Sequence, residues 1–257
     1  MEPITDYKLL LDTAVLAGEL MLKNGAEIYR VEDTVSRILA RSGLETRQAY
    51  VTSTGFIVTL DDPKVDSMTV VRRVAERDVN LNKIAMANTV SRRFCSGEIS
   101  LEEAFRSLKH MEGSLYSQLQ KDLGMLLLIS AFPLLLGSSL PDALGAVVAG
   151  VLLVLTLRIG RKMGWNLFLQ TLLSSGVVAL GAAGLARIPG IGLNMDMMII
   201  GAIMPMLPGA ALTTAVRDTL QGDYVAGGAK ALEALVKVAA IVIGVGFGIS
   251  VMGGNRL

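Results

Sequence analysis

The chain has almost none of the residues that build disulfides and zinc centres. Its 257 residues include one cysteine, Cys95, and one histidine, His110. A disulfide needs two cysteines and a zinc centre needs several ligands, so neither is predicted. No glycine-rich loop precedes a Lys-Ser or Lys-Thr pair, and a net charge of +1 gives no reason to expect nucleic acid. We therefore predict no metal, no cofactor and no nucleic-acid partner.

Charged residues are scarce in the second half of the chain. Residues 1–122 contain 34 Asp, Glu, Lys or Arg, whereas residues 123–257 contain only 13. The hydrophobic share of 52% and the mean hydropathy of +0.53 are high for a soluble protein of this length. We predict an α-helical membrane bundle in residues 122–257, fused to a water-soluble domain in residues 1–121.

Five apolar stretches follow this change in composition. The predicted transmembrane helices lie near residues 123–139, 142–158, 165–186, 195–216 and 231–253. A helix that crosses a bilayer takes roughly 20 residues, and the first two stretches are close to the minimum. Basic residues are concentrated in alternate connections, after the second span and after the fourth, namely Arg158, Arg161, Lys162, Arg217 and Lys230. Because basic loops stay inside, the N-terminal domain is predicted to be cytoplasmic.

Residues 1–121 show the patterns of an α+β domain. Two amphipathic helices come first, and Gly25 is the expected left-handed residue at the end of the first helix. Strands are expected at 46–52, 55–60 and 67–74, and two more helices at 81–95 and 101–111. Ser100 and Glu103 have the spacing of a capping box for the last helix. A domain of this size can form a core of its own.

The fourth apolar stretch contains two prolines, Pro205 and Pro208, which should interrupt the helix inside the membrane. A half-helix that restarts at Pro208 has its positive dipole end and free N–H groups at the break, which suits a carboxylate. The predicted substrate-binding residues are Pro208, Gly209, Ala210, Thr213 and Thr214, with the N–H of Ala211 beside them. The alternative is a kink that only helps the helices to pack.

Charged residues near the predicted helix ends are further candidates. We predict gating or proton coupling for Arg217, Asp218 and Glu233, although each also suits an interfacial anchor, since charges there reach water at little cost. In the N-terminal domain, four charged residues are predicted to shape the cytoplasmic entrance or to dock the domain on the bundle: Glu19, Glu27, Arg30 and Glu32. Surface salt bridges, such as one between Glu27 and Arg30, are the alternative interpretation.

Two segments resemble the threonine/serine exporter family. Residues 18–34 read GELMLKNGAEIYRVEDT and resemble the family's N-terminal signature. A second set of residues resembles the family's late membrane motif: Pro208-Gly209, Arg217-Asp218, Gly222-Asp223 and the stretch through Lys230 and Glu233. The resemblance implies a multi-pass secondary exporter of the bacterial inner membrane, driven by the proton gradient, with a cytoplasmic N-terminal domain. Members export threonine and serine, or, in related two-chain systems, a dicarboxylate such as succinate.

The longest members of this family continue through a second set of membrane helices, whereas this chain has about five. It therefore resembles the larger subunit of a split exporter, whose second subunit is a small multi-span membrane protein. A homo-oligomer is also compatible with the sequence. The substrate, the coupling ion and its stoichiometry, and transport by the chain alone stay open. The competing functions are a membrane-anchored hydrolase that uses the N-terminal carboxylates and a non-transporting membrane sensor or scaffold; we predict a transporter and not an enzyme.

Overall fold

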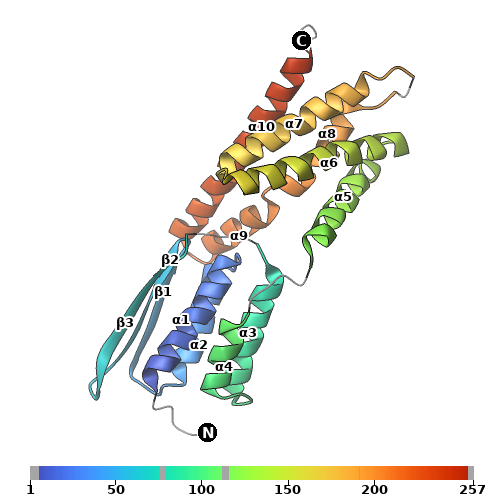
Figure 1. Ribbon diagram of the computed structural model, residues 1–257. Coiled ribbons are helices and arrows are strands. Elements are labelled where there is room, and N and C mark those ends of the chain that lie inside the picture. The colour runs from blue at the N-terminus through green and yellow to red at the C-terminus, as the bar shows by residue number, and fades with distance from the viewer. Residues whose placement is uncertain (1–5, 76–78, 112–115, 191, 254–257) are drawn as a thin grey trace. The chain divides into compact units, whose positions relative to one another are not determined.

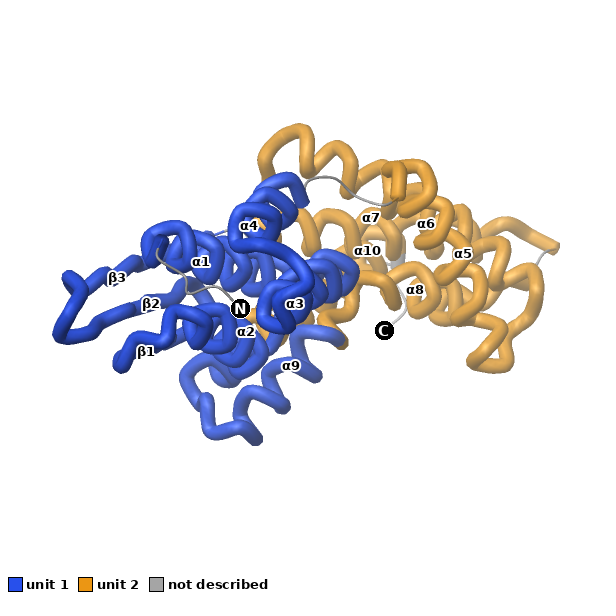
Figure 2. Tube along the Cα trace, turned by 90° about the horizontal axis from the view of Figure 1, so that it is seen from below, with its two compact units in different colours: residues 1–113, 210–232 blue, residues 114–209, 233–257 orange. Residues whose placement is uncertain are grey.

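The computed structural model describes residues 6–75, 79–111, 116–190 and 192–253. The chain forms two compact units (Figure 2). Unit 1 consists of Met1–Gly113 and Ala210–Leu232, and unit 2 of Ser114–Gly209 and Glu233–Leu257. These units divide the chain differently from the predicted domains 1–121 and 122–257, because residues 210–232 belong to unit 1.

Unit 1 is an α+β unit built around a three-stranded antiparallel sheet of order β1-β2-β3. The strands are β1 (Thr46–Thr52), β2 (Gly55–Asp62) and β3 (Val65–Arg73). Its N-terminal helices are α1 (Tyr7–Lys23), α2 (Ile28–Ala40), α3 (Leu81–Ser96) and α4 (Leu101–Lys109). The unit is completed by nearly all of α9 (Gly209–Leu220) and the first turns of α10 (Tyr224–Gly253). Figure 1 shows α1 and α2 against one face of the sheet, with α3 and α4 beyond them.

The core of unit 1 lies between the sheet and these helices. Val51, Phe56, Val58 and Leu60 alternate along β1 and β2 and are buried on the helix side, as the period of two in a strand requires. A Cβ at Gly18 of α1 would lie 2.9 Å from a methyl group of Val35 and 3.3 Å from the ring of Phe56. The glycine therefore lets α1 approach both α2 and β2. The opposite face of the sheet is exposed, including Tyr50, Ile57 and Val71.

The local signals of the N-terminal segment are confirmed. All three strands and four helices form, with ends within a few residues of those expected. Gly25 has a φ of +87°, and Ser100 and Glu103 form both hydrogen bonds of the capping box. Asp33 and Arg37, four residues apart on α2, form an ion pair at 2.8 Å. These features depend on residues close together in the chain, which is why the sequence reveals them.

Unit 2 is a helical bundle. It contains α5 (Gln118–Leu135), α6 (Leu140–Met163), α7 (Leu167–Ala186), α8 (Met195–Ile203), the 3₁₀ turn η1 (Met204–Met206) and the rest of α10. Small residues mark the places where helices cross. A Cβ at Gly201 of α8 would lie 2.6 Å from the ring of Pro133 in α5, and one at Gly244 of α10 would lie 2.3 Å from the carbonyl oxygen of Leu172 in α7. Such close backbone approach is typical of membrane bundles.

In the described part of the chain, three helices are long and apolar enough to cross a membrane, namely α6, α7 and residues 224–252 of α10. A fourth span results if α8, η1 and α9 are counted as one broken span. The first predicted span, in α5, does not qualify, because its opening turns carry Gln118, Lys121 and Asp122 and leave a short apolar part. Length and composition thus support three or four spans, and the count of five stays a prediction.

Candidate functional site

The backbone is interrupted where the two prolines predict. Helix α8 ends at Ile203, the 3₁₀ turn follows with Pro205 inside it, and α9 begins at Gly209. Between them Leu207 is extended, with φ −62° and ψ 135°. Proline removes a backbone donor and disfavours helical geometry in the residue before it, so Pro208 explains the extended Leu207. The predicted break is confirmed.

The five predicted substrate residues lie at this break and in the first turns of α9. Pro208 is buried, Gly209, Ala210 and Thr213 are exposed, and Thr214 is half-buried. The amide of Gly209 donates to the carbonyl of Leu207 at 2.9 Å. The hydroxyl of Thr214 donates to the carbonyls of Ala210 and Ala211, each at 3.0 Å. Two of the expected donors are thus engaged within the chain, and the role of this segment in binding substrate stays a prediction.

A cluster of charged side chains in unit 1 joins two groups of predicted residues that the sequence keeps apart. We call it the α2–α9 cluster; its members are Glu27, Arg30, Arg217, Asp218 and Lys230. One carboxylate oxygen of Glu27 pairs with the guanidinium of Arg217, and the other lies 3.4 Å from that of Arg30. Glu27 is the N-cap residue of α2, and Arg217 lies in the last turn of α9. The cluster therefore ties the start of one helix to the end of the other.

Asp218 is the buried centre of this cluster. Its side chain is 0% exposed and that of Lys230 is 12% exposed, and Asp218 Oδ2 lies 2.6 Å from Lys230 Nζ. The other carboxylate oxygen accepts the backbone N–H of Ile28, the first residue of α2, at 3.3 Å. Asp218 thus satisfies a free donor at the N-terminus of α2, where a negative charge also complements the helix dipole.

The turn between α9 and α10 sets the position of Lys230. Gly222 has a φ of +92°, which favours glycine, and the N–H of Asp223 donates to the carbonyl of Asp218 at 3.0 Å. The side chain of Asp223 then accepts the N–H of Ala226 at 3.0 Å and caps α10. This cap explains why α10 begins at Tyr224 and not near the predicted residue 231. Lys230 follows two turns later, on the side of Asp218.

The carboxyl groups of α2 differ in their electrostatics. Burial alone would raise the pKa of Glu27, but hydrogen bonds from its own backbone N–H and from Arg217, with the charges of Arg30 and Arg217, hold that pKa below its ordinary value. Burial raises the pKa of Glu32, and the charge of Asp223 adds to the effect, although the N–H of Val51 donates to Glu32 at 3.1 Å. Glu27 is therefore held ionised, whereas Glu32 takes up a proton more readily.

The other predicted candidates lie elsewhere. Glu19 of α1 is 3.8 Å from Arg72 of β3 in a half-exposed pair, and Glu32 connects α2 to β1, so neither shares an ion pair or hydrogen bond with the α2–α9 cluster among the described residues. Glu233 is exposed on the part of α10 that belongs to unit 2. Among the described residues, no group of three or more His, Cys, Asp or Glu side chains is placed to hold a metal ion.

Unit 2 contains buried polar groups that sequence reasoning did not connect. Asp122 of α5 accepts from Gln118 at 2.8 Å and pairs with Arg158 of α6. Asp142 accepts the N–H of Asn194 at 2.6 Å and so links the start of α6 to the segment before α8. No spacing in the sequence signals these contacts, because their members lie 36 and 52 positions apart.

Comparison with known proteins adds an independent finding. A family model described as "Putative threonine/serine exporter" matches residues 12–252. The chain is 25% identical over 246 residues to a protein of Mycobacterium tuberculosis (strain ATCC 25618 / H37Rv) named "Probable threonine/serine exporter". That alignment covers 92% of this chain and 45% of the mycobacterial protein, so the chain spans less than half of that relative's length. No solved structure matches the chain.

Proposed function

Because this chain belongs to the threonine/serine exporter family, we propose that it is a subunit of a proton-driven secondary exporter of small carboxylate-bearing metabolites. The family and the apolar helices make it a membrane protein of an export system. We further propose that the exporter lies in the bacterial inner membrane and that the N-terminal domain faces the cytoplasm. This orientation follows from the basic connections between the predicted spans.

The α2–α9 cluster is the observation that carries the proposal. Helix α9 begins directly after the break at Pro208. At its other end, Arg217 pairs with Glu27, the N-cap residue of α2, and Asp218 accepts the first N–H of α2. A movement that changes the break must therefore either carry α2 along or separate these ion pairs. We propose that the cluster couples the conformation of the broken helix to that of the N-terminal domain and so takes part in gating.

The roles of the charged residues follow from their surroundings. Glu27 is held ionised between Arg30 and Arg217, so we assign it to docking α9 and not to proton transfer. Arg217 and Asp218 are the proposed gating residues, and Asp218 and Glu233 the proposed proton-coupling residues. Arg30 holds Glu27 in place, whereas Glu19 and Glu32 shape the cytoplasmic entrance.

We propose threonine and serine as the first substrates to test, because the family description and the name of the mycobacterial relative both state them. A dicarboxylate such as succinate is the second, since a helix N-terminus recognises a carboxylate without reading the rest of the molecule. The substrate carboxylate would bind at the break, beside Pro208, Gly209 and Ala210. The hydroxyls of Thr213 and Thr214 would contact the remainder of the substrate.

We also propose a second subunit, a small multi-span membrane protein of the same family. Transporter sites often lie between two structural repeats, and the sequence of this chain shows no internal repeat. The bundle of unit 2 would then supply one side of the pathway and the second subunit the other. Assembly as a homo-oligomer is the alternative arrangement.

Uptake into inverted vesicles tests the proposed function. Labelled threonine, serine and succinate are supplied to vesicles that contain the chain alone or together with a candidate second subunit. We expect accumulation of at least one of them, driven by an imposed pH gradient and abolished by an uncoupler. Absence of gradient-dependent uptake of all three, with and without the second subunit, would contradict the proposal.

A variant of the break tests the proposed site. We expect Pro205→Leu with Pro208→Leu to lower the initial rate about tenfold or more, which corresponds to about 1.4 kcal/mol of barrier. The matched control is Pro141→Ala, in the first turn of α6. The backbone N–H that proline lacks would have no partner within the helix at this position, so the substitution should change little. Equal rates for the two variants would argue against a site at the break and would favour a kink that only helps the helices to pack.

A further inference from the structure

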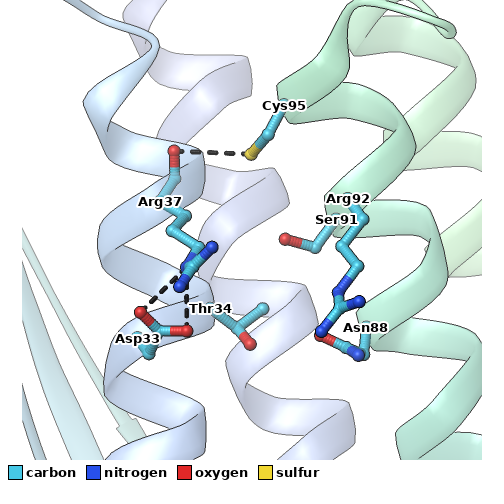
Figure 3. A pocket seen from close by; sticks show the side chains of 7 residues that line it. All are labelled: Asp33, Thr34, Arg37, Asn88, Ser91, Arg92 and Cys95. Atoms are coloured by element: carbon cyan, nitrogen blue, oxygen red, sulfur yellow. Dashed lines mark hydrogen bonds and ion pairs between the residues drawn. The ribbon is translucent and has the colours of Figure 1, made fainter.

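A cavity of about 150 Å³ lies between α2 and α3, within unit 1 and apart from the α2–α9 cluster. Helix α2 contributes Asp33, Thr34 and Arg37, and helix α3 contributes Asn88, Ser91, Arg92 and Cys95 (Figure 3). One enclosed water needs roughly 10–15 Å³ of such space, so the cavity has room for a small molecule. No residue of the proposed transport function lines it.

The polar groups of the cavity favour a negatively charged ligand. Arg37 donates to both carboxylate oxygens of Asp33 at 2.8 Å, so these two charges neutralise each other. Arg92, on the opposite helix, has no ion pair with any described residue, and its guanidinium extends beside the side chain of Asn88 (Figure 3). The lining therefore keeps one unbalanced positive charge.

Two hydroxyl groups lie between the helices beside this charge. Thr34 and Ser91 are each 3% exposed, and Figure 3 shows their side chains in the space between α2 and α3. Hydroxyl and amide groups donate hydrogen bonds to oxygen atoms, and a guanidinium presents two parallel donors to a carboxylate or a phosphate. Thr34, Asn88, Ser91 and Arg92 thus supply donors from both helices to a ligand between them.

We propose that this cavity is a binding site for a small oxyanion, a phosphate or a carboxylate. Arg92 anchors the oxyanion with its guanidinium, and Asn88, Ser91 and Thr34 donate hydrogen bonds to the remaining oxygen atoms. A bound anion bridges α2 and α3 and balances the charge of Arg92. Binding to the folded state alone also stabilises that state by mass action.

Cys95 provides a reporter inside the site. It lines the cavity, is half-buried and is the only cysteine of the chain, so a thiol reagent marks this position alone. Burial raises the pKa of the Cys95 thiol, and labelling is therefore measured at pH 8.5 to about 9 to obtain enough thiolate. The experiment uses the full chain in detergent and follows the rate of alkylation by N-ethylmaleimide.

We expect inorganic phosphate, succinate or threonine to slow the alkylation of Cys95 with saturation, at an ionic strength held constant with sodium chloride. The Arg92→Gln variant should weaken this protection about tenfold or more, because a hydrogen bond to a charged group is lost. Arg93→Gln is the matched control, since Arg93 is adjacent but pairs with Glu98 at 3.5 Å and does not line the cavity. It should retain full protection.

The alkylation rate without ligand shows whether each variant is folded, since an unfolded chain would expose Cys95. Protection by phosphate alone identifies a tetrahedral oxyanion, and protection by succinate or threonine alone identifies a carboxylate. The proposal is overturned if none of the three protects, if sodium chloride protects equally, or if Arg92→Gln is protected as well as the unaltered chain. Because the alkylation of Cys95, with or without ligand, does not measure transport, failure of this experiment leaves the proposed export function unaffected.

Discussion

At the scale of single residues, Asp218 shows how one buried charge can organise two helices. Among the described ion pairs, that of Asp218 with Lys230 has the least exposed side chains. Burying both charges removes their hydration, so removal of either partner leaves the other as a buried, uncompensated charge. Asp218 also accepts the first N–H of α2, and it therefore contributes to the stability of a helix 190 positions away in the chain.

The first prediction concerns the removal of this carboxylate. We expect Asp218→Asn to destabilise unit 1 by about 3–5 kcal/mol, because Lys230 is left buried without a counter-charge. Hydrogen exchange of the α2 amides in the full chain measures the effect, and the fluorescence of Trp165, the only tryptophan and part of unit 2, reports whether that unit stays folded.

The control for this variant is Asp33→Asn, which removes an ion pair with Arg37 whose side chains are 55% and 65% exposed. A solvated pair contributes roughly 1 kcal/mol or less, so exchange in α2 should change little. If the two variants had equal effects, the special contribution of burial would be refuted.

The second prediction concerns pH and contrasts the two glutamates of α2. The pKa of Glu27 is lowered below its ordinary value of 4.5, so its stabilising effect is present above that value and is lost as the pH falls through the folded-state pKa. The pKa of Glu32 is raised, so its ionised form opposes folding, and stability relative to a neutral side chain rises as the pH falls towards 4.5.

Glu27→Gln and Glu32→Gln should therefore behave in opposite ways between pH 7 and about 3.5. Near neutral pH we expect Glu27→Gln to unfold more easily than the unaltered chain, and the difference should shrink in acid. Glu32→Gln should be as stable as the unaltered chain or more so at neutral pH, since its amide oxygen still accepts the N–H of Val51. Thermal unfolding across this pH range measures both, and parallel profiles would contradict the assignment.

At the scale of elements, the hairpin of α9 and α10 depends on a close helix crossing at Gly227. A Cβ there would lie 2.2 Å from the hydroxyl of Thr219 and 2.9 Å from the carbonyl oxygen of Ala215. The side chain of Thr219 can move, but the backbone of α9 cannot move without opening the hairpin. The same crossing positions Lys230 for Asp218, so the ion pair depends on the packing of the two helices.

The third prediction follows from this crossing. We expect Gly227→Ala to destabilise unit 1 by about 1–3 kcal/mol through overpacking, with a loss of exchange protection in the first turn of α2. Gly228→Ala is the matched control, because a Cβ at Gly228 meets nothing within 4 Å and alanine favours a helix. Circular dichroism melting curves of the two variants should therefore separate clearly. Unaltered melting of Gly227→Ala would show that the crossing is not tight in solution.

At the scale of the whole molecule, the orientation of the chain is defined by the side of the membrane on which unit 1 lies. Basic residues in alternate connections predict that the N-terminal domain is cytoplasmic. The native Cys95 of unit 1 allows this orientation to be measured without any engineered residue.

The fourth prediction concerns this orientation. We expect a membrane-impermeant maleimide to label Cys95 in inverted vesicles and to leave it unlabelled in intact spheroplasts. Cys95→Ser, which should label in neither preparation, controls for other reactive groups. Labelling in spheroplasts alone would place unit 1 outside and would reverse the proposed direction of access.

The sequence by itself determined what depends on neighbouring residues. The strands, the cap at Ser100, the left-handed Gly25 and the interruption at Pro205 and Pro208 all follow from local backbone preferences. The change in charge near Asp122 likewise predicts an apolar bundle after a mixed domain, since bilayer and water select opposite compositions, but residues 210–232 belong to unit 1.

Only the tertiary structure decided which charges meet. The sequence placed Glu27 in the N-terminal domain and Arg217 with Asp218 behind the broken helix, as two separate groups of candidates. Packing brings Arg217 to Glu27, and Asp218 to the N–H of Ile28, across 190 positions. Local pattern carries no information about such pairs, because an ion pair forms where packing removes water from both partners. Lys230 illustrates the reason, since only the turn at Gly222 makes a residue of a predicted connecting segment the counter-charge of a buried aspartate.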